Sequence, residues 1–216
     1  MPSITPETEM LGQLSETKRI LSALERNLQK SAPICFMVTS ASHGEGKTLM
    51  AAGLSVVAGK GGLRRVLAVD LNWYAPALHN CFGLKREFDT AELSSENSLK
   101  KVVQPSGIPN LDILTAPQWD QDGNGSNLYN PEMGEGIIKQ ARNNYDITII
   151  DTSPISALNR RMIDPAMISV SADGVALLVL SAVTPRQDVN RACFSLKAGG
   201  ANIIGVIVNQ WKNPIV

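Results

Sequence analysis

The stretch that decides the fold of this chain is Thr39-Ser40-Ala41-Ser42-His43-Gly44-Glu45-Gly46-Lys47-Thr48. It follows a short apolar run, 34–38, and precedes an Ala-, Leu- and Val-rich segment with helical spacing. A strand, a glycine-rich turn that ends in Gly-Lys-Thr and a helix, in this order, are typical of a phosphate-binding loop. The glycines let backbone N–H groups close on phosphate oxygens, and the start of the helix adds its unpaired donors. The stretch therefore predicts a nucleotide site.

One position of the loop departs from the usual pattern, in which a glycine stands six residues before the lysine. Ala41 occupies that position, so the alternative is a glycine-rich turn that binds nothing. The place of Gly-Lys-Thr at a strand-to-helix junction favours the phosphate loop. Lys47 would reach the β- and γ-phosphates, and the Thr48 hydroxyl would ligate Mg²⁺. We expect the cofactor-binding residues of the loop to be Ser42, His43, Gly44, Glu45, Gly46, Lys47, Thr48 and Leu49.

Composition limits the functional classes that remain open. The 216 residues fit one domain with a buried core, and the formal net charge is zero. This balance shows no electrostatic footprint for nucleic acid. The longest apolar stretch, 174–180, is too short to span a bilayer, and the first residues do not form a signal peptide. Three widely spaced cysteines, Cys35, Cys81 and Cys193, predict buried free thiols and a cytoplasmic protein.

The chain divides into an N-terminal helix, 1–30, and a nucleotide-binding domain, 31–216. Apolar residues recur at helical spacing through the first thirty residues, with Thr5 as N-cap and Pro6 in the first turn. Six apolar runs then alternate with helical patterns, at 34–38, 65–69, 111–114, 147–150, 175–180 and 203–208. This alternation predicts an α/β fold, a mainly parallel sheet with helices on both faces and ligands beyond the strand carboxyl ends. The polar segment 119–130 predicts a loop whose role stays open.

Two strands end in carboxylates. The run 147–151 ends at Asp151, and the run 66–70 ends at Asp70. In a phosphate-loop protein such an aspartate holds Mg²⁺ opposite the Thr of the loop. A carboxylate at a strand end also occurs in α/β folds that bind no metal, but here Thr48 is expected across the sheet.

Three blocks of this sequence resemble the bacterial tyrosine kinases, which belong to the larger MinD/ParA group of P-loop ATPases. Residues 39–48 match their Walker A block, 70–84 their Walker A′ block and 145–154 their Walker B block. Where MinD proper carries a second, signature lysine, this chain has Ser42, as the kinases tend to. The resemblance therefore implies a P-loop NTPase three-layer fold that binds ATP or ADP with Mg²⁺.

The resemblance also assigns roles to individual residues. It implies Lys47, Asp70 and Asp151 as catalytic residues, and Thr48 with both aspartates as the metal site. The closing segments 172–174 and 205–209 match the family as well, and the resemblance implies that Asn209 contacts adenine.

The function that the resemblance implies is an autokinase of exopolysaccharide or capsule synthesis and export. Such a kinase works with a membrane-embedded chain-length regulator. We expect no transmembrane segment in this chain, so that partner would act in trans and recruit a cytoplasmic protein to the inner face of the membrane. Family analogy leaves a homo-oligomer open.

Three departures from the family pattern concern activity and assembly. Asn72 stands where the family has the second Asp of Walker A′, and an amide cannot accept a proton as a general base does. The C-terminal tyrosine cluster has no counterpart, and the three tyrosines are expected inside the fold, at Tyr74, Tyr129 and Tyr145. The N-terminal interface motif Glu-x-x-Arg-x-x-Arg has no match, and the nearest alignment places Arg19, Ser22 and Glu25 there.

These departures predict an ATP-binding member of the family with weakened or lost tyrosine kinase activity. An active tyrosine autokinase is the first alternative, and a MinD/ParA-type positioning ATPase, against which Ser42 argues, is the second. The pair Trp73-Tyr74 is either an exposed partner-binding patch or packs against Pro76, and the sequence does not decide between them.

Overall fold

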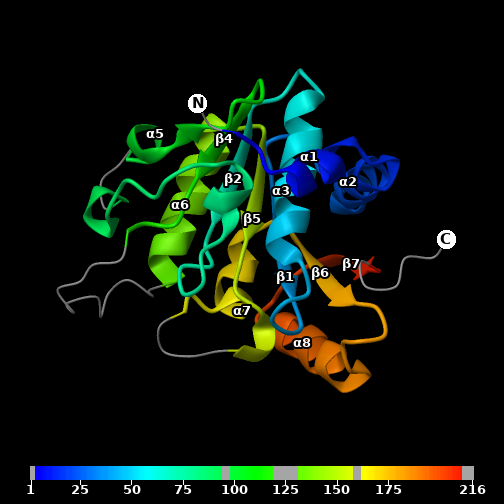
Figure 1. The fold of residues 1–216 in the computed structure, drawn as a ribbon. Helices are drawn as coiled ribbons and strands as arrows, with labels where there is room; N and C mark the ends of the chain where they lie inside the picture. Colours follow the sequence, from blue (N-terminus) through cyan, green and yellow to red (C-terminus); the bar gives the residue numbers. More distant parts are fainter. Residues whose placement is uncertain (1–2, 94–97, 119–130, 158–161, 211–216) are drawn as a thin grey trace.

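A seven-stranded sheet forms the centre of the computed structural model, which describes residues 3–93, 98–118, 131–157 and 162–210. The strand order is β3-β4-β2-β5-β1-β6-β7 (Figure 1). The strands are β1 (Ile34–Ser40), β2 (Val66–Asp70), β3 (Gln104–Pro105), β4 (Leu111–Leu114), β5 (Ile147–Asp151), β6 (Gly174–Leu180) and β7 (Ile203–Asn209). All neighbours are parallel except β3 and β4, which confirms the predicted sheet.

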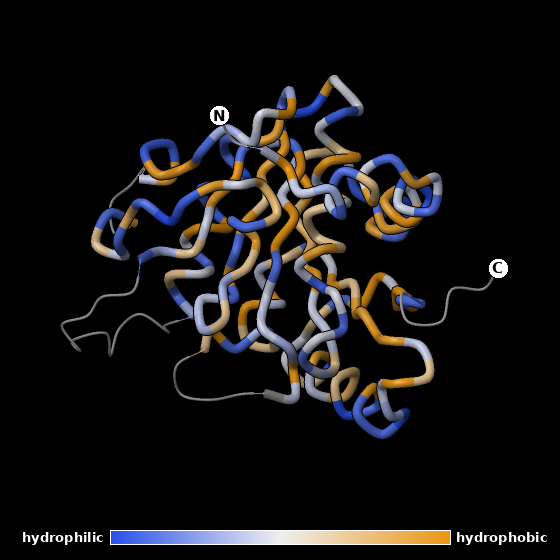
Figure 2. The backbone as a smooth tube through the Cα atoms, in the orientation of Figure 1, coloured by the Kyte–Doolittle hydropathy of each residue, from blue (hydrophilic) through white to orange (hydrophobic). Residues whose placement is uncertain are grey.

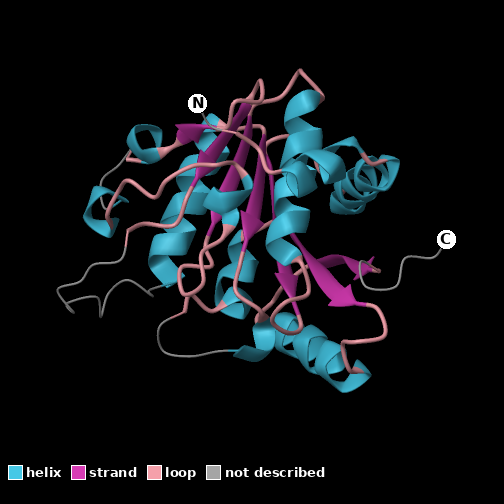
Figure 3. Ribbon diagram, in the orientation of Figure 1, coloured by secondary structure: helices cyan, strands magenta, loops and turns pink. Residues whose placement is uncertain are grey.

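Helices cover both faces of the sheet, as Figure 3 shows. One face carries α1 (Pro6–Gln13), α2 (Ser15–Leu28), α3 (Lys47–Lys60) and α4 (Leu78–Cys81). The other carries α5 (Leu99–Val102), α6 (Pro131–Asn144), α7 (Pro165–Ile168) and α8 (Arg186–Ala198). Short 3₁₀ turns lie at Thr90–Leu93, Ile155–Ala157 and Ser169–Ser171. The predicted three-layer fold is confirmed.

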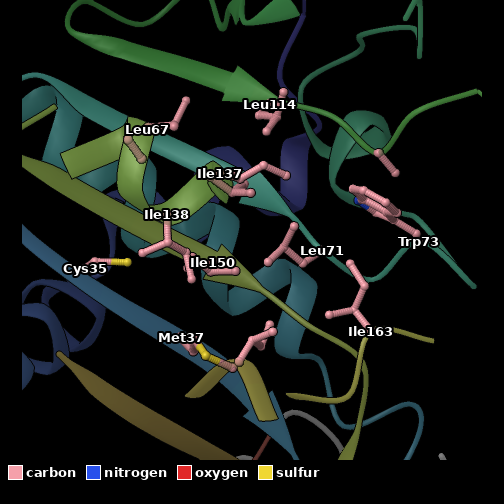
Figure 4. Packing of buried hydrophobic residues seen from close by; sticks show 14 of the residues in the cluster. Cys35, Met37, Leu67, Leu71, Trp73, Leu114, Ile137, Ile138, Ile150 and Ile163 are labelled. Carbon is pink, nitrogen blue, oxygen red and sulfur yellow. The ribbon is translucent and has the colours of Figure 1, made fainter. Parts of the chain in front are cut away.

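The core lies on both sides of the sheet because side chains of a strand alternate between its faces. On β1, Cys35 and Met37 contact the cluster under α6, whereas Phe36 and Val38 contact the cluster under α3. Figure 4 shows Cys35 near Ile138 of α6 and Met37 in the same cluster, and Figure 2 shows hydrophobic residues concentrated along the central strands. Near-continuous apolar strands therefore reflect burial on both faces.

The N-terminal region contains two helices, so the single predicted helix is wrong in this respect. Leu14 has an extended backbone, with φ −62° and ψ 135°, and separates α1 from α2. The break lets α1 lie on α3 while α2 contacts α3 and β7. The predicted N-cap is confirmed, because the Thr8 amide donates to Thr5 Oγ1 at 3.4 Å and Pro6 begins the helix.

Other expectations from the sequence are met in part. Cys35 is buried and free, whereas Cys81 and Cys193 are free and only partly buried. Strand β3 was not predicted, since two residues that include a proline at a sheet edge carry no period-two signal. The segment 119–130 lies outside the described residues. Within the described ranges no helix has the length and apolar character needed to cross a bilayer.

Asp173, directly before β6, contacts β1, α6 and the connection between α2 and β1. Its carboxylate accepts hydrogen bonds from the Cys35 amide, Lys30 Nζ and Arg142 Nη1, each at 2.7 Å. Burial of this carboxyl raises its pKa, but the bonds from Arg142 and Lys30 outweigh burial, and the net pKa is lowered. The ionised form therefore stabilises the fold.

Replacing Asp173 with Asn should lower the free energy of unfolding by about 2 kcal/mol near neutral pH, because two cations lose their anion. A lowered pKa stabilises above the pKa of a free aspartate, about 4, and the contribution is lost as the pH falls through the folded value. The difference between the two proteins should therefore shrink in acid. Urea unfolding at neutral and acid pH measures both effects.

Asp188→Asn is the matched control for this substitution. Asp188 forms a 3.6 Å pair with Arg191, whose side chain is 78% exposed, so its loss should cost less than about 0.5 kcal/mol. Equal effects of the two substitutions at neutral pH would contradict the role assigned to Asp173.

Candidate functional site

The phosphate loop lies between β1 and α3, and its backbone requires glycine at two positions. Gly44 and Gly46 have φ of +75° and +90°, a region that other residues rarely adopt. A Cβ at Gly46 would also lie 2.7 Å from Asn209 Nδ2. Helix α3 begins at Lys47 without a side-chain cap, so the first-turn N–H groups remain for an anion. The local structure is that of an anion-binding loop.

Thr48 and Asp151 lie in contact at the start of α3. Thr48 Oγ1 donates to Asp151 Oδ2 at 2.6 Å, as the predicted opposition of the two residues requires. Asp151 is fully buried, and its other oxygen, Oδ1, has no hydrogen-bond partner among the described residues. A buried, unpartnered carboxylate oxygen beside a hydroxyl suits a hard divalent cation. These two residues could therefore hold Mg²⁺.

Protein ligands for such an ion are few. The described residues contain no group of three or more His, Cys, Asp or Glu side chains arranged for a metal. A Mg²⁺ site does not require such a group, because Mg²⁺ usually keeps several waters and binds phosphate oxygens with one or two carboxylates.

Asp70 lies beside Asp151 because β2 and β5 pair in register at these two residues. Burial, and then repulsion from Asp151, raise the pKa of Asp70 to about 8. Burial also raises the pKa of Asp151 to about 6, although Lys47 and the Thr48 hydroxyl act to lower it. The pair therefore carries an electrostatic cost that a bound cation would offset.

The Asp70 carboxylate organises the loop that follows β2. Its Oδ1 accepts from the backbone N–H of Asn72 at 3.0 Å. Its Oδ2 accepts from the backbone N–H groups of Ala77 and Leu78 at 3.2 and 3.1 Å. Asp151 is therefore better placed than Asp70 for direct contact with a metal, and an effect of Asp70 would pass through a water or the loop.

Asn72 is buried and uses both ends of its amide. Its Nδ2 donates to the Ala75 carbonyl at 2.8 Å, and its Oδ1 accepts from Ser153 Oγ at 2.9 Å. A carboxylate accepts but does not donate, so an aspartate could not form the bond to Ala75. The amide connects the loop after β2 to the segment after β5.

The two residues of the pair Trp73-Tyr74 differ in burial, and neither predicted alternative is tested for the pair as a whole. Trp73 is buried in the core (Figure 4), and its Nε1 donates to the Asp70 carbonyl at 2.8 Å. Tyr74 is 46% exposed, so its expected place inside the fold is wrong. Tyr145 is buried as expected, and Tyr129 lies outside the described residues.

Glu45 has a structural role that the sequence did not reveal. Its carboxylate is buried, accepts from the Ser42 amide at 2.9 Å and accepts from the Thr184 hydroxyl. Its carbonyl accepts from Asn209 Nδ2 at 2.9 Å. The side chain thus holds the phosphate loop against the connection after β6, and the backbone carbonyl holds it against β7. The spacing between these residues is too long for a local signal.

The structure brings the predicted site residues together at the carboxyl ends of β1, β2, β5 and β7. The loop residues 42–49, the two aspartates and Asn209 all lie at this edge, and His43 is exposed. Leu49 and Asn209 line a cavity beside the loop, to which Met50 and Leu180 also contribute, two residues that sequence reasoning missed.

This fold and this loop define a P-loop nucleotide-binding domain. Residues 36–215 match the CobQ/CobB/MinD/ParA nucleotide binding domain, and the chain belongs to this family. Within it, the chain belongs with the bacterial tyrosine-protein kinases. It is 31% identical to tyrosine-protein kinase YwqD of Bacillus subtilis (strain 168) over 177 residues, which cover 82% of this chain and 72% of YwqD.

Other comparisons support the same family, and some of the relatives are much longer proteins. Tyrosine-protein kinase etk of Escherichia coli (strain K12) is 28% identical over 97% of this chain, which spans only 28% of the length of etk. The solved kinase domain of E. coli tyrosine kinase ETK superposes with a TM-score of 0.79 at 24% identity, covering 93% of this chain and 76% of that domain. The septum site-determining protein MinD of Pyrococcus horikoshii OT3, complexed with Mg-ADP, gives a TM-score of 0.67 at 23% identity, covering 84% and 72%. Both structures show the shared fold.

Asp151→Asn should stabilise the protein free of nucleotide and Mg²⁺, because it removes one of two adjacent buried charges. Carboxyls with raised pKa keep protons that the unfolded chain releases, so the stability of the wild type should fall as the pH rises from about 4 to about 8. The stability of the variant should fall less steeply with pH. Near pH 8 its melting temperature should exceed that of the wild type by at least about 2 °C.

Thermal unfolding in EDTA across this pH range measures the effect, with Asp188→Asn as a control that should leave the slope unchanged. A slope equal to that of the wild type, or a lower melting temperature throughout, would contradict the cost assigned to the pair.

Proposed function

We propose that this chain binds Mg·ATP or Mg·ADP and acts in exopolysaccharide or capsule biosynthesis or export, with tyrosine kinase activity weakened or lost. The observation that carries the binding proposal is the contact between Thr48 and Asp151 at the mouth of a glycine-requiring loop. Family membership supports the same chemistry.

Each site residue has a role in this proposal. The backbone of 43–48 and the Lys47 ammonium bind the phosphates, and Thr48 with Asp151 holds Mg²⁺. When bound, the ion would supply positive charge against the phosphates. Asp70 orients the loop after β2, and Asn209 contacts the base.

The proposal of weakened kinase activity depends on Asn72. Its amide is engaged on both sides, by Ser153 and Ala75, and it carries no proton-accepting group. An active autokinase is the alternative, favoured by relatives named as tyrosine-protein kinases. A MinD/ParA-like positioning ATPase fits less well, because Ser42 stands where MinD carries its signature lysine and the relative at 31% identity is named a tyrosine-protein kinase.

The cellular setting follows from the same family. We propose that the protein is cytoplasmic and meets a membrane-embedded chain-length regulator in trans at the inner face of the membrane. A homo-oligomer would fit this setting as well.

Lys47→Ala should weaken Mg·ATP binding at least tenfold, about 1.4 kcal/mol, because a charge-assisted contact to phosphate is lost. Isothermal titration calorimetry measures this. Lys60→Ala at the exposed end of the same helix is the control and should bind as the wild type does. Equal affinities of the wild type and Lys47→Ala would remove the basis for the proposed phosphate site.

Asn72→Asp should raise transfer of ³²P from γ-labelled ATP to a Glu-Tyr copolymer by about 10²-fold or more, because it supplies a general base. Asn72→Ala, which removes the amide without adding a carboxylate, should not show this rise. Label transfer by the wild type that depends on Lys47 would instead favour the active-kinase alternative.

A further inference from the structure

A cavity of about 240 Å³ lies beside the phosphate loop, on the side of α3. Its walls are Gly44, Gly46, Leu49, Met50, Leu180 and Asn209, together with Leu11 of helix α1. Apolar walls with one amide suit a flat aromatic base, which has apolar faces and a polar edge. The cavity is smaller than the roughly 300–1,000 Å³ of a typical small-molecule pocket, so it fits a base and not a whole nucleotide.

Leu11 reaches this cavity because α1 lies unusually close to α3. A Cβ at Gly53 of α3 would lie 2.9 Å from the Cβ of Leu11, and a Cβ at Gly12 of α1 would lie 2.3 Å from Val56 Cγ1. Each helix therefore presents a glycine to a side chain of the other, and the two backbones approach closely. Figure 1 shows α1 lying across α3. The position of Leu11 is fixed by this packing.

The segment before α1 contacts residues 81–83, at the end of α4 and just after it. The Thr5 amide donates to the Cys81 carbonyl at 3.0 Å, and a Cβ at Gly83 would lie 2.5 Å from the Ser3 carbonyl oxygen. Cys81 ends α4, whose first residue, Leu78, donates its amide to Asp70. Residues 3–13 thus extend from the neighbourhood of Asp70 to the cavity.

We propose that Leu11 forms one wall of the site for the nucleotide base, so that helix α1 contributes to the preference for a nucleoside triphosphate over a bare polyphosphate. This rests on the proposed binding of Mg·ATP. The base would lie between Leu11 and the side chains of α3, and the phosphates would lie in the loop. The N-terminal helix is then a part of the binding site that neither the loop motif nor the acidic motifs contain.

The test compares two ligands, Mg·ATP and Mg·tripolyphosphate, which share phosphates but differ in the nucleoside. Isothermal titration calorimetry on the full chain gives both affinities for the wild type, Leu11→Ala, Leu11→Met and Met10→Ala. Leu11→Ala should lose about five- to tenfold in affinity for ATP, because methyl and methylene contacts with the base are removed. Its affinity for tripolyphosphate should equal that of the wild type, which also shows that the variant is folded.

The other two variants control for side effects. Leu11→Met keeps the apolar volume and should bind ATP as the wild type does. Met10 is 42% exposed on the same helix, so Met10→Ala should change neither affinity.

Unchanged ATP binding by Leu11→Ala, or an equal loss for both ligands, would overturn the inference. A wild type that binds both ligands with the same affinity would also overturn it while leaving the phosphate site intact. A wild type that binds neither ligand would refute the proposed function itself.

Discussion

Two carboxylates buried side by side are the constraint on which the site depends. The in-register pairing of β2 and β5 places Asp70 next to Asp151 at the end of the sheet, and neither is exposed. Burial and repulsion raise the pKa of both groups, so the ionised pair is costly in the folded chain. Backbone amides offset this at Asp70, and the Thr48 hydroxyl does so at one oxygen of Asp151. Asp151 Oδ1 has no hydrogen-bond partner in the described part of the chain, so added positive charge would stabilise the site most at this oxygen. The electrostatic cost and the proposed binding of a cation would therefore have the same origin.

Helix α3 connects the phosphate loop to the sheet and to the N-terminal helices. It begins at the phosphate loop, carries Thr48 and is buried along most of its length, with the sheet on one side and α1 and α2 on the other. A helix with apolar side chains all round is stable only when it is enclosed in this way. The loop is therefore positioned by packing on both sides of α3, and Glu45 adds its bonds to Ser42 and Thr184.

Local patterns in the sequence predicted much of this structure, and contacts between distant segments account for what they did not predict. Each of the six apolar runs is a strand. In the five interior strands, burial on both faces favours continuous apolar residues, whereas Val206 and Val208 of the edge strand β7 are exposed. Gly44 and Gly46 were expected in the loop, since their backbone conformation excludes most side chains. The single extended residue at Leu14 interrupts a helical pattern without changing its periodicity, so the break was missed. The hydrogen bond between Glu45 and Thr184 joins residues 139 positions apart, so no local sequence pattern could predict it.

Asn72 can meet one of the two chemical requirements of a phosphate-transfer site, binding of the phosphates, but not the other, transfer of a phosphoryl group. Binding needs N–H donors and positive charge held in place, and transfer needs a group that accepts a proton. The amide of Asn72 serves the first demand, because its bonds to Ala75 and Ser153 hold the loop whose backbone donates to Asp70. A carboxylate at this position would lose the bond to Ala75 and place a third negative charge near the two buried aspartates. The same substitution that withholds a general base therefore strengthens the frame around Asp70, which is the physical reason why binding can persist in the proposed function while transfer declines.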